Sequence, residues 1–252
     1  MSTKIAVITG ASRGLGRNMA LHLAARGVEI VGTYNSRADE AEGVAREIVA
    51  RGSSAQMLQL DCGSAASIAA FAQALPPVLK DGFRRTTFDY LINNAGMGVY
   101  ANFVDTTEEQ LDRLYAVHVK APFLLSQKLL PLMEDGGRII NLSSGLARFS
   151  LPGYSAYASM KGAIEVLTRY MAKELGARRI TVNVVAPGAI ETDFGGGVVR
   201  DNPEINKNVA STIPLGRAGL PDDVGGAVAA LLSEDCGWIN GTRIEVSGGQ
   251  NI

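Results

Sequence analysis

The sequence predicts an α/β fold in which a doubly wound parallel sheet of about seven strands is flanked by helices. Short apolar runs of β character alternate along the chain with amphipathic segments of helical period. The segments that join these runs are long enough to cross over a sheet, which makes successive strands parallel. No repeat, low-complexity tract or linker interrupts the 252 residues. We therefore expect a single domain over residues 1–252.

In the first half of the chain, each predicted strand is followed by a predicted helix. The strand at residues 5–9 leads into a glycine-rich turn and an amphipathic helix that ends near Gly27. A short polar connection at residues 80–87 precedes the last strand of this half. The other predicted strands are residues 30–34, 55–60 and 88–93, and the other predicted helices are residues 38–51 and 65–75.

The second half continues this alternation with one long interruption. Thr106-Thr107-Glu108-Glu109 is a predicted capping box for a helix that runs to residue 130, and the helix that carries Tyr157 is predicted to end near Gly176. Residues 189–220 follow a strand end, where ligands bind in doubly wound sheets, so we expect a substrate lid there. The other predicted strands are residues 138–142, 181–186 and 243–246, and the other predicted helix is residues 222–232.

Composition and charge narrow the function. Lys and Arg total 24 against 25 Asp and Glu, a net charge of -1, and no basic block stands out. A nucleic-acid or anionic-membrane surface is therefore not indicated, and a small-molecule partner is favoured. The apolar run at residues 5–8 is too short for a signal sequence or a membrane span, and Cys62 and Cys236 form no metal or disulfide pattern. We expect a cytoplasmic protein without a metal site.

The turn after the first strand is a candidate phosphate site. Gly10-x-x-x-Gly14-x-Gly16 stands between a predicted strand and a predicted helix, as in Rossmann-type folds. Backbone N–H groups and the helix dipole can hold a pyrophosphate there. The spacing departs from Gly-x-Gly-x-x-Gly, because Met19 stands where the third glycine is expected. Glycine-rich turns without ligands are common, so the next strand decides whether a dinucleotide binds.

The end of the second strand favours NADP(H) over NAD(H), although NAD(H) stays possible. An NAD site has an acidic residue there for the ribose 2′-hydroxyl, whereas this chain has Tyr34-Asn35-Ser36-Arg37. Arg37, together with Arg13 in the glycine turn, would meet a 2′-phosphate with two positive charges. The alternative is that both arginines are solvated surface charges.

Tyr157 and Lys161 form a candidate acid/base pair. Residues four apart on a helix share a face, so the ammonium can act on the phenol. A positive charge at roughly 4 Å would lower the pKa of the Tyr by up to ~3 units, toward neutrality. A Tyr-x-x-x-Lys pair alone is more often an ordinary helix face, so its context must carry the interpretation.

That context is a series of motifs that fall in order at predicted strand ends. The chain resembles the classical short-chain dehydrogenases/reductases over nearly its whole length, most of all the branch that contains the 3-oxoacyl-[acyl-carrier-protein] reductases. The motifs are Thr9-Gly10-Ala11-Ser12-Arg13-Gly14-Leu15-Gly16, Asp61, Asn93-Asn94-Ala95-Gly96, Ser144, Tyr157-x-x-x-Lys161 and Pro187-Gly188-Ala189-Ile190-Glu191-Thr192.

The resemblance implies an NADP(H)-dependent oxidoreductase that interconverts a carbonyl and a secondary alcohol. Ser144 would hydrogen-bond the carbonyl, Tyr157 would donate the proton, and Lys161 would lower the pKa of the Tyr and bind the ribose. Ser143 is the neighbouring candidate, but the family spacing of thirteen residues before the Tyr selects Ser144. The implied cofactor contacts are Gly10, Ser12, Arg13, Gly14, Leu15, Gly16, Tyr34, Asn35, Ser36, Arg37, Asp61, Cys62, Asn93, Ala95, Gly96, Tyr157, Lys161, Pro187, Gly188, Ile190 and Thr192.

One departure from the family concerns the relay that would carry a proton to the Tyr157 and Lys161 pair. His118 stands where the family usually has an Asn that helps to hold a relay water behind the Lys. A His can hold a water through one ring nitrogen and titrates near about pH 6.5, so we hypothesise an active relay with altered pH dependence. Equally, His118 fills the space and the relay is weakened.

Another departure concerns the substrate. Carrier-protein reductases tend to have basic residues at two docking positions; this chain has Glu134-Asp135 at the first and Arg178-Arg179 at the second. The acidic pair favours a free small carbonyl or alcohol over an acidic carrier. The alternatives are a carrier-protein reductase proper, a sugar or polyol dehydrogenase, and a non-catalytic dinucleotide-binding sensor. Residues 194–210 are expected to shape the pocket.

The resemblance also implies a homotetramer. Trp238 and the apolar helix at residues 227–232 are candidates for the interface between subunits, and equally for the core.

Overall fold

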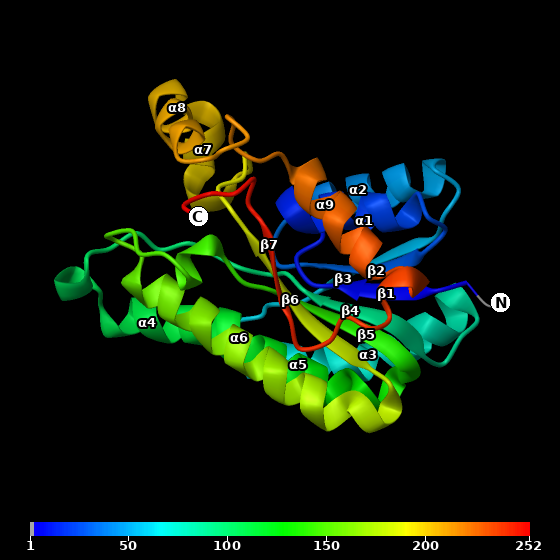
Figure 1. Ribbon diagram of the computed structural model, residues 1–252. Helices are drawn as coiled ribbons and strands as arrows, with labels where there is room; N and C mark the ends of the chain where they lie inside the picture. Colours follow the sequence, from blue (N-terminus) through cyan, green and yellow to red (C-terminus); the bar gives the residue numbers. More distant parts are fainter. Residues whose placement is uncertain (1–2) are drawn as a thin grey trace.

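A seven-stranded parallel sheet forms the centre of the protein, as the sequence predicts (Figure 1). The computed structural model describes residues 3–252. All neighbouring strands are parallel, in the order β3-β2-β1-β4-β5-β6-β7. The strands are β1 (Ile5–Ile8), β2 (Glu29–Tyr34), β3 (Ala55–Gln59), β4 (Phe88–Asn93), β5 (Met133–Leu142), β6 (Thr181–Pro187) and β7 (Arg243–Val246).

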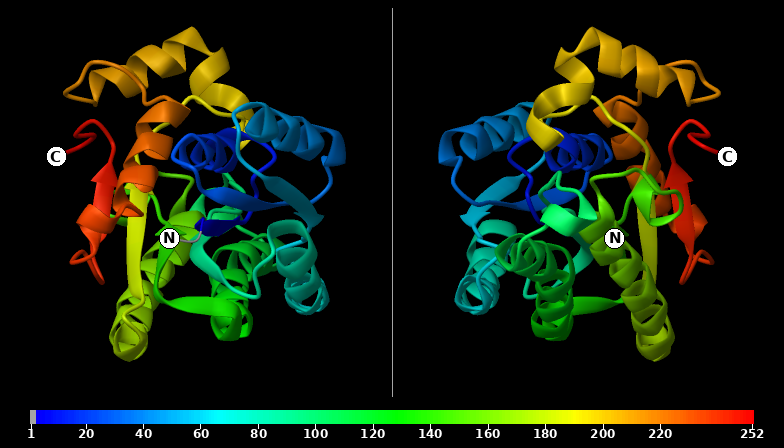
Figure 2. Two further views of the ribbon diagram at one scale, coloured as in Figure 1. Left: turned by 90° about the vertical axis from the view of Figure 1, so that its right-hand side faces the viewer. Right: turned by 90° about the vertical axis from the view of Figure 1, so that its left-hand side faces the viewer.

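Helices cover both faces of the sheet, and Figure 2 shows the two layers along the strands. One layer consists of α1 (Gly14–Ala24), α2 (Ala38–Ala50) and α9 (Pro221–Leu231). The opposite layer consists of α3 (Ala65–Phe83), α4 (Glu108–Tyr115), α5 (Ala121–Leu129) and α6 (Ser155–Leu175). Two short helices, α7 (Val198–Asp201) and α8 (Pro203–Ser211), follow the carboxyl end of β6.

The core lies in two clusters, one on each face of the sheet. Successive residues of β1 alternate between them: Ile5 and Val7 belong to the cluster under α3 and α5, and Ala6 and Ile8 to the cluster under α1 and α9. All four side chains are fully buried. This burial explains why β1 is a continuous apolar run and not an alternating one.

The strand order places the ligand-binding edge of the sheet. The chain builds β2 and β3 on one side of β1 and continues with β4 on the other side, so the direction of winding reverses between β1 and β4. Doubly wound sheets bind ligands at the carboxyl ends of the strands near such a reversal. Every predicted site segment follows the carboxyl end of a strand and so reaches this edge.

Two predicted helices differ from the observed ones. Helix α3 continues through Pro76 and Pro77 to Phe83, because Leu75, Leu79 and Phe83 stay buried on its apolar side. The first half of the predicted connection, residues 80–83, is therefore helix. The single helix predicted from the capping box at residues 106–109 to residue 130 is interrupted by a π-helical turn at Ala116–Lys120.

The capping box of α4 is present, and its last member is a Gln. Thr107 Oγ1 accepts a hydrogen bond from the Gln110 N–H at 3.3 Å, and Gln110 Oε1 accepts one from the Thr107 N–H at 3.1 Å. The observed box, Thr107 to Gln110, therefore lies one residue after the predicted one at Thr106 to Glu109, and the helix begins at Glu108.

Residues 189–220 are an ordered segment with a closed base. They contain a 3₁₀ turn at Phe194–Gly197, then α7 and α8, and Ile190 pairs with Gly219 where the two ends of the segment meet. We call residues 189–220 the lid segment; its action as a lid stays a prediction. Among residues 3–252, no helix combines the length and apolar character that a bilayer crossing requires.

Candidate active site

The glycine turn has the geometry of an anion cradle. Gly10 and Gly14 have positive φ angles, and a Cβ on Gly16 would lie 2.0 Å from the Gly10 carbonyl oxygen. Among residues 3–252, no side chain caps the N-terminus of α1 and no acidic residue stands in its first turn. The free N–H groups and the positive end of the helix dipole are therefore available to a phosphate.

The two predicted phosphate-binding arginines differ in what they already bind. Arg13 lies 3.8 Å from Asp193 and its side chain is half exposed. Arg37 is held by Glu40 at 2.8 Å, and the sequence reasoning did not consider this carboxylate. Arg13 therefore has more of its charge available to a 2′-phosphate than Arg37.

At the end of β4, the side chain of Asn94 hydrogen-bonds to the glycine turn, whereas that of Asn93 does not. Asn94 Nδ2 donates to the carbonyls of Thr9 at 2.8 Å and Gly10 at 3.1 Å. The side-chain amide of Asn93 instead donates to Asn141 Oδ1 and Ser126 Oγ, inside the layer of α5 and α6. The side chain of Asn93 therefore links β4 to β5 and α5, and a cofactor contact of Asn93 stays a prediction for its backbone.

The three predicted catalytic side chains meet where β5 ends and α6 begins. Ser144 follows β5 and its Oγ accepts a hydrogen bond from the Leu146 N–H at 3.2 Å. Tyr157 and Lys161 are one turn apart on α6 and are both almost fully buried. Lys161 Nζ lies 5.5 Å from the centre of the Tyr157 ring and donates to the Leu142 carbonyl at 2.7 Å.

Burial controls the acid/base properties of this pair, and the result corrects the sequence-based expectation. Burial raises the pKa of Tyr157 above its usual value, with a smaller opposing effect from the Ser144 hydroxyl. Burial lowers the pKa of Lys161 to about 7. The pKa of Tyr157 is therefore not brought toward neutrality in this structure, because the effect of burial outweighs that of the Ser144 hydroxyl.

His118 is a buried neighbour of this pair on the π-helical turn. Its ring packs edge-to-face on Tyr157, with 5.2 Å between ring centres. Nε2 lies 2.8 Å from the Met97 carbonyl oxygen, which we assign as a hydrogen bond donated by the ring. Nδ1 is then a buried acceptor that has no partner within the described part of the chain.

The surroundings of His118 keep its ring neutral. Burial, and then the charge of Lys161, lower the pKa of His118 to about 3, against a smaller opposing effect of the hydrogen bond to Met97. The expectation of a titration near about pH 6.5 is therefore wrong. Gly96 permits the close packing, since a Cβ there would lie 2.9 Å from His118 Cε1.

One aromatic side chain of the lid segment packs against Tyr157, and a second aromatic pair lies outside that segment. The centre of the Phe194 ring, in the lid segment, lies 5.7 Å from that of Tyr157. Tyr100 and Tyr154 form a second pair, with 5.4 Å between ring centres. Phe194 approaches the backbone closely at Gly98, where a Cβ would lie 3.0 Å from the ring. The sequence reasoning missed Tyr100 and Tyr154, because no motif contains them.

The remaining predicted cofactor contacts lie along the same edge. Gly188 follows β6 and donates to the Val246 carbonyl at 3.0 Å, and Thr192 is buried beside Gly14. Asp61 borders a cavity of about 510 Å³ between β3 and α3. Cys62 is buried, and burial raises the pKa of its thiol to about 12, so it is an unreactive thiol.

The basic pair at the predicted docking position is partly neutralised. Arg178 binds Asp135 at 2.7 Å and donates to the carbonyls of Leu130 and Met133. Only Arg179 of that pair is left for an acidic carrier, which strengthens the sequence-based argument for a free substrate.

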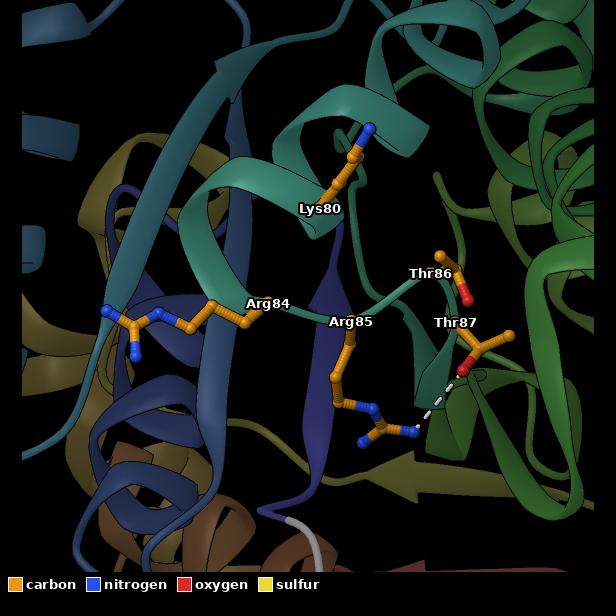
Figure 3. Close-up of a pocket in the computed structure, with 5 residues that line it drawn as sticks. All are labelled: Lys80, Arg84, Arg85, Thr86 and Thr87. Carbon is orange, nitrogen blue, oxygen red and sulfur yellow. Dashed lines mark hydrogen bonds between the residues drawn. The ribbon is translucent and has the colours of Figure 1, made fainter.

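A cavity of about 380 Å³ lies at the opposite edge of the sheet, just before β4, and is lined by Lys80, Arg84, Arg85, Thr86 and Thr87. Its cationic groups do not converge: in Figure 3 the side chains of Lys80 and Arg84 point away from that of Arg85. Arg85 already binds Asp89 at 2.6 Å and Glu134 at 3.3 Å. This cavity therefore lacks the converging donors that are predicted to bind a phosphate at the glycine turn.

Comparison with known proteins agrees with this geometry. The model of a protein family described as enoyl-(acyl carrier protein) reductase matches residues 10–251. The hydroxynaphthalene reductase-like protein Arp2 of Metarhizium brunneum is 35% identical over 261 residues, which cover 99% of this chain and 95% of that protein.

Two solved ketoreductase structures are similar over almost the full chain. The promiscuous reductase LugOII, which catalyses keto-reduction at C1 during lugdunomycin biosynthesis, has a TM-score of 0.95 and 41% identity and covers 100% of this chain and 99% of its own. The angucycline C-6 ketoreductase LanV with bound NADP has a TM-score of 0.93 and 38% identity and covers 98% and 95%.

Proposed function

The chain belongs to the short-chain dehydrogenase/reductase family, and from this premise we propose that it is an NADP(H)-dependent ketoreductase with Tyr157 as its acid/base. Members with named reductase activities match it end to end, so it is an NAD(P)-dependent oxidoreductase that interconverts a carbonyl and a secondary alcohol. The observation that carries the proposal for Tyr157 is the meeting of Ser144, Tyr157 and Lys161 at the carboxyl edge.

The chain's own residues fit a nicotinamide dinucleotide. The uncapped start of α1 would hold the pyrophosphate, and Arg13 would bind a 2′-phosphate; the NADP in the structure of LanV supports this preference. Thr192, beside Gly14, would lie near the nicotinamide end. The cofactor, when bound, supplies the hydride.

The buried pair is suited to proton donation. The raised pKa of Tyr157 keeps its phenol protonated in the resting enzyme, so that the O–H can pass its proton to the carbonyl oxygen as that oxygen gains charge. Ser144 would donate a second hydrogen bond to the same oxygen. Lys161, charged below about pH 7, would stabilise the phenolate that is left behind.

We further propose a hydroxylated fused-ring ketone as the substrate. Of the relatives named above, Arp2 is a hydroxynaphthalene reductase-like protein and LanV is an angucycline C-6 ketoreductase. Phe194, which packs against Tyr157, and the pair Tyr100 and Tyr154 offer aromatic faces on which a flat ring system can stack. Phe194 covers Tyr157 here, so the substrate would enter as the lid segment moves about Gly195–Gly197, which all have positive φ.

A homotetramer stays our proposal for the assembly. Trp238 is 99% exposed, whereas Val228, Ala229 and Leu232 of the neighbouring helical stretch are buried. Of the two predicted interface candidates, Trp238 therefore favours an interface and the helix belongs to the core. The molecular mass of wild type and of Trp238→Ser in solution, measured by light scattering, tests this assignment.

The function is tested by NADPH oxidation with a panel of ketones. The panel contains a hydroxylated fused-ring ketone, small ketones and aldehydes, and β-ketoacyl thioesters with and without a carrier protein; the reverse reaction uses NADP⁺ with secondary alcohols and free sugars. We expect the highest kcat/KM for the fused-ring ketone. Preference for the carrier-bound thioester or for a sugar would replace the substrate proposal, and cofactor binding without any turnover would favour a sensor.

A further inference from the structure

Four side chains of alternating charge, Glu165, Arg243, Glu245 and Arg148, form a chain of ion pairs that we call the ladder. The ladder joins α6, which carries Tyr157 and Lys161, to the C-terminal segment at residues 243–252. Arg243 Nε donates to Glu165 Oε1 at 2.7 Å, and its Nη1 donates to Glu245. Arg148 Nε donates to the same Glu245 oxygen at 2.7 Å. The four side chains are 15% to 36% exposed, so the ladder is shielded from water more than an ordinary surface ion pair.

One end of the ladder holds the segment that carries Ser144. Arg243 Nη2 donates to the Ser144 carbonyl at 3.1 Å, and Ser143 Oγ donates to Glu165 at 2.6 Å. Glu165 lies four residues after Lys161 and eight after Tyr157, on the same face of α6. Arg243 and Glu165 therefore fix the chain at Ser144 relative to the helix that carries the acid/base pair.

The other end of the ladder holds the base of the lid segment. Arg148 donates to the carbonyls of Gln250 at 2.8 Å and Asn251 at 3.0 Å. The buried side chain of Gln250 accepts from the Ala189 N–H at 3.0 Å and donates to Thr212 Oγ1 at 3.3 Å. The C-terminal segment thus contacts the lid segment both at its start and after α8.

We propose that Arg243 is a positioning residue: it sets Ser144 against Tyr157 and, through Glu245 and Arg148, couples that placement to the lid segment. A guanidinium has five donors in a rigid plane, so one Arg can hold Glu165, Glu245 and the Ser144 carbonyl at once. Small misplacements of a catalytic group lower the rate strongly. The inference rests on the proposed function only for the role of Ser144.

The kinetic test compares Arg243→Gln, Arg243→Lys and Arg148→Gln with a matched control, Arg178→Gln. Arg178 also binds one carboxylate and two carbonyls, but far from the site at the amino edge. We expect Arg243→Gln to lower kcat roughly 10- to 100-fold with an unchanged Kd for NADPH. Arg243→Lys recovers part of this loss, because an ammonium can still bind Glu165, and Arg178→Gln retains kcat. Equal kcat in the Arg243 and Arg178 variants overturns the positioning role.

Hydrogen exchange tests the coupling without any turnover. Arg243→Gln and Arg148→Gln are expected to speed amide exchange at residues 143–149 and also at residues 189–192 and 247–252, whereas Arg178→Gln leaves these segments unchanged. Exchange that rises only around the substituted residue, or equally in the control, overturns the coupling. A wild-type protein that reduces no ketone would instead refute the proposed function, and the exchange result would still decide the coupling.

Discussion

Buried polar side chains at the two edges of the sheet differ in how completely they are hydrogen-bonded. At the amino edge, Asp89 is 2% exposed and accepts hydrogen bonds from Lys4 Nζ, the Ile5 N–H and Arg85 Nη1 at 2.6 to 2.9 Å. At the carboxyl edge, His118 Nδ1 is buried without a partner among residues 3–252, and Lys161 Nζ binds only a carbonyl. The satisfied groups stabilise the fold, and the incompletely bonded groups are available to ligands.

Two lysines show the consequence of this difference. The hydrogen bond from Lys4 to Asp89 raises the pKa of Lys4, so its contribution to stability is present below about pH 10.5 and is lost as the pH rises through the raised value. Burial lowers the pKa of Lys161 to about 7. The contribution of Lys161 to the free energy of unfolding is therefore highest above about pH 10.5, where Lys161 is neutral in both states. It decreases as the pH falls toward 7, because the unfolded chain binds the proton more readily than the folded one, so Lys161 opposes folding at neutral pH.

The largest effect is expected when Lys161 is replaced: the activity should fall while the free energy of unfolding rises. Lys161→Met removes the charge that stabilises the Tyr157 phenolate, so kcat should fall by about 10²- to 10⁴-fold. The same change removes a buried ammonium and should raise the free energy of unfolding at pH 7 by on the order of 2 kcal/mol. Ketone turnover and urea denaturation measure the two effects. Lys173→Met, at an exposed position of α6, is the control and should change neither; a destabilised Lys161→Met would contradict the comparison.

At the amino edge the opposite result is expected. Asp89→Asn leaves Lys4 and Arg85 without their carboxylate and should lower the free energy of unfolding by about 3 kcal/mol, with kcat of the folded enzyme unchanged. Asp135→Asn breaks an exposed pair with Arg178 and should lower it by less than about 1 kcal/mol. Equal losses in the two variants, measured by urea denaturation, would mean that burial does not distinguish these pairs.

The pH dependence of ketone reduction follows from Lys161. As the pH rises through about 7, Lys161 loses the charge that assists Tyr157, so kcat should decline by about tenfold between about pH 6 and pH 9. Stopped-flow single turnovers with saturating NADPH measure this decline apart from cofactor binding. A rate that stays constant over the same range would show that the pKa of Lys161 is not depressed in the working enzyme.

The smallest effect is expected at His118. Its depressed pKa predicts that His118 adds no inflection of its own between about pH 5 and pH 8, so wild type and His118→Asn should show the same decline from Lys161. If Nδ1 holds a relay water, His118→Asn should keep kcat within about threefold, whereas His118→Leu, which has no acceptor, should lower it about tenfold. Equal rates for the two variants would leave His118 as a space-filling residue.

Local chemistry in the sequence was sufficient to predict most of the fold. The apolar runs located the strands, although β5 begins at Met133 and not at residue 138. The glycine turn and the motif at residues 106–109 located two helix starts, the second to within one residue, because each depends on neighbouring residues. The π-helical turn at Ala116–Lys120 and the length of α3 depend on tertiary packing, which outweighs Pro76 and Pro77.

The site was predictable in its residues but not in its energetics. The positions of Ser144, Tyr157 and Lys161 at one edge follow from spacing and parallel strands. The direction of the pKa shift of Tyr157 does not, because desolvation is a property of the folded surroundings. Glu165 stands one turn after Lys161 on the same helix face, but its partner Arg243 lies 78 residues away in the chain.

The single-turnover rate of Tyr157→Phe tests the central claim most directly. This change removes only the phenolic oxygen, on which the proposed proton transfer at the carboxyl edge depends. With NADPH bound and a hydroxylated fused-ring ketone as substrate, the rate should fall by about 10³-fold while the Kd for NADPH stays unchanged. A rate that stays within about tenfold of wild type would contradict the assignment of Tyr157 as the proton donor.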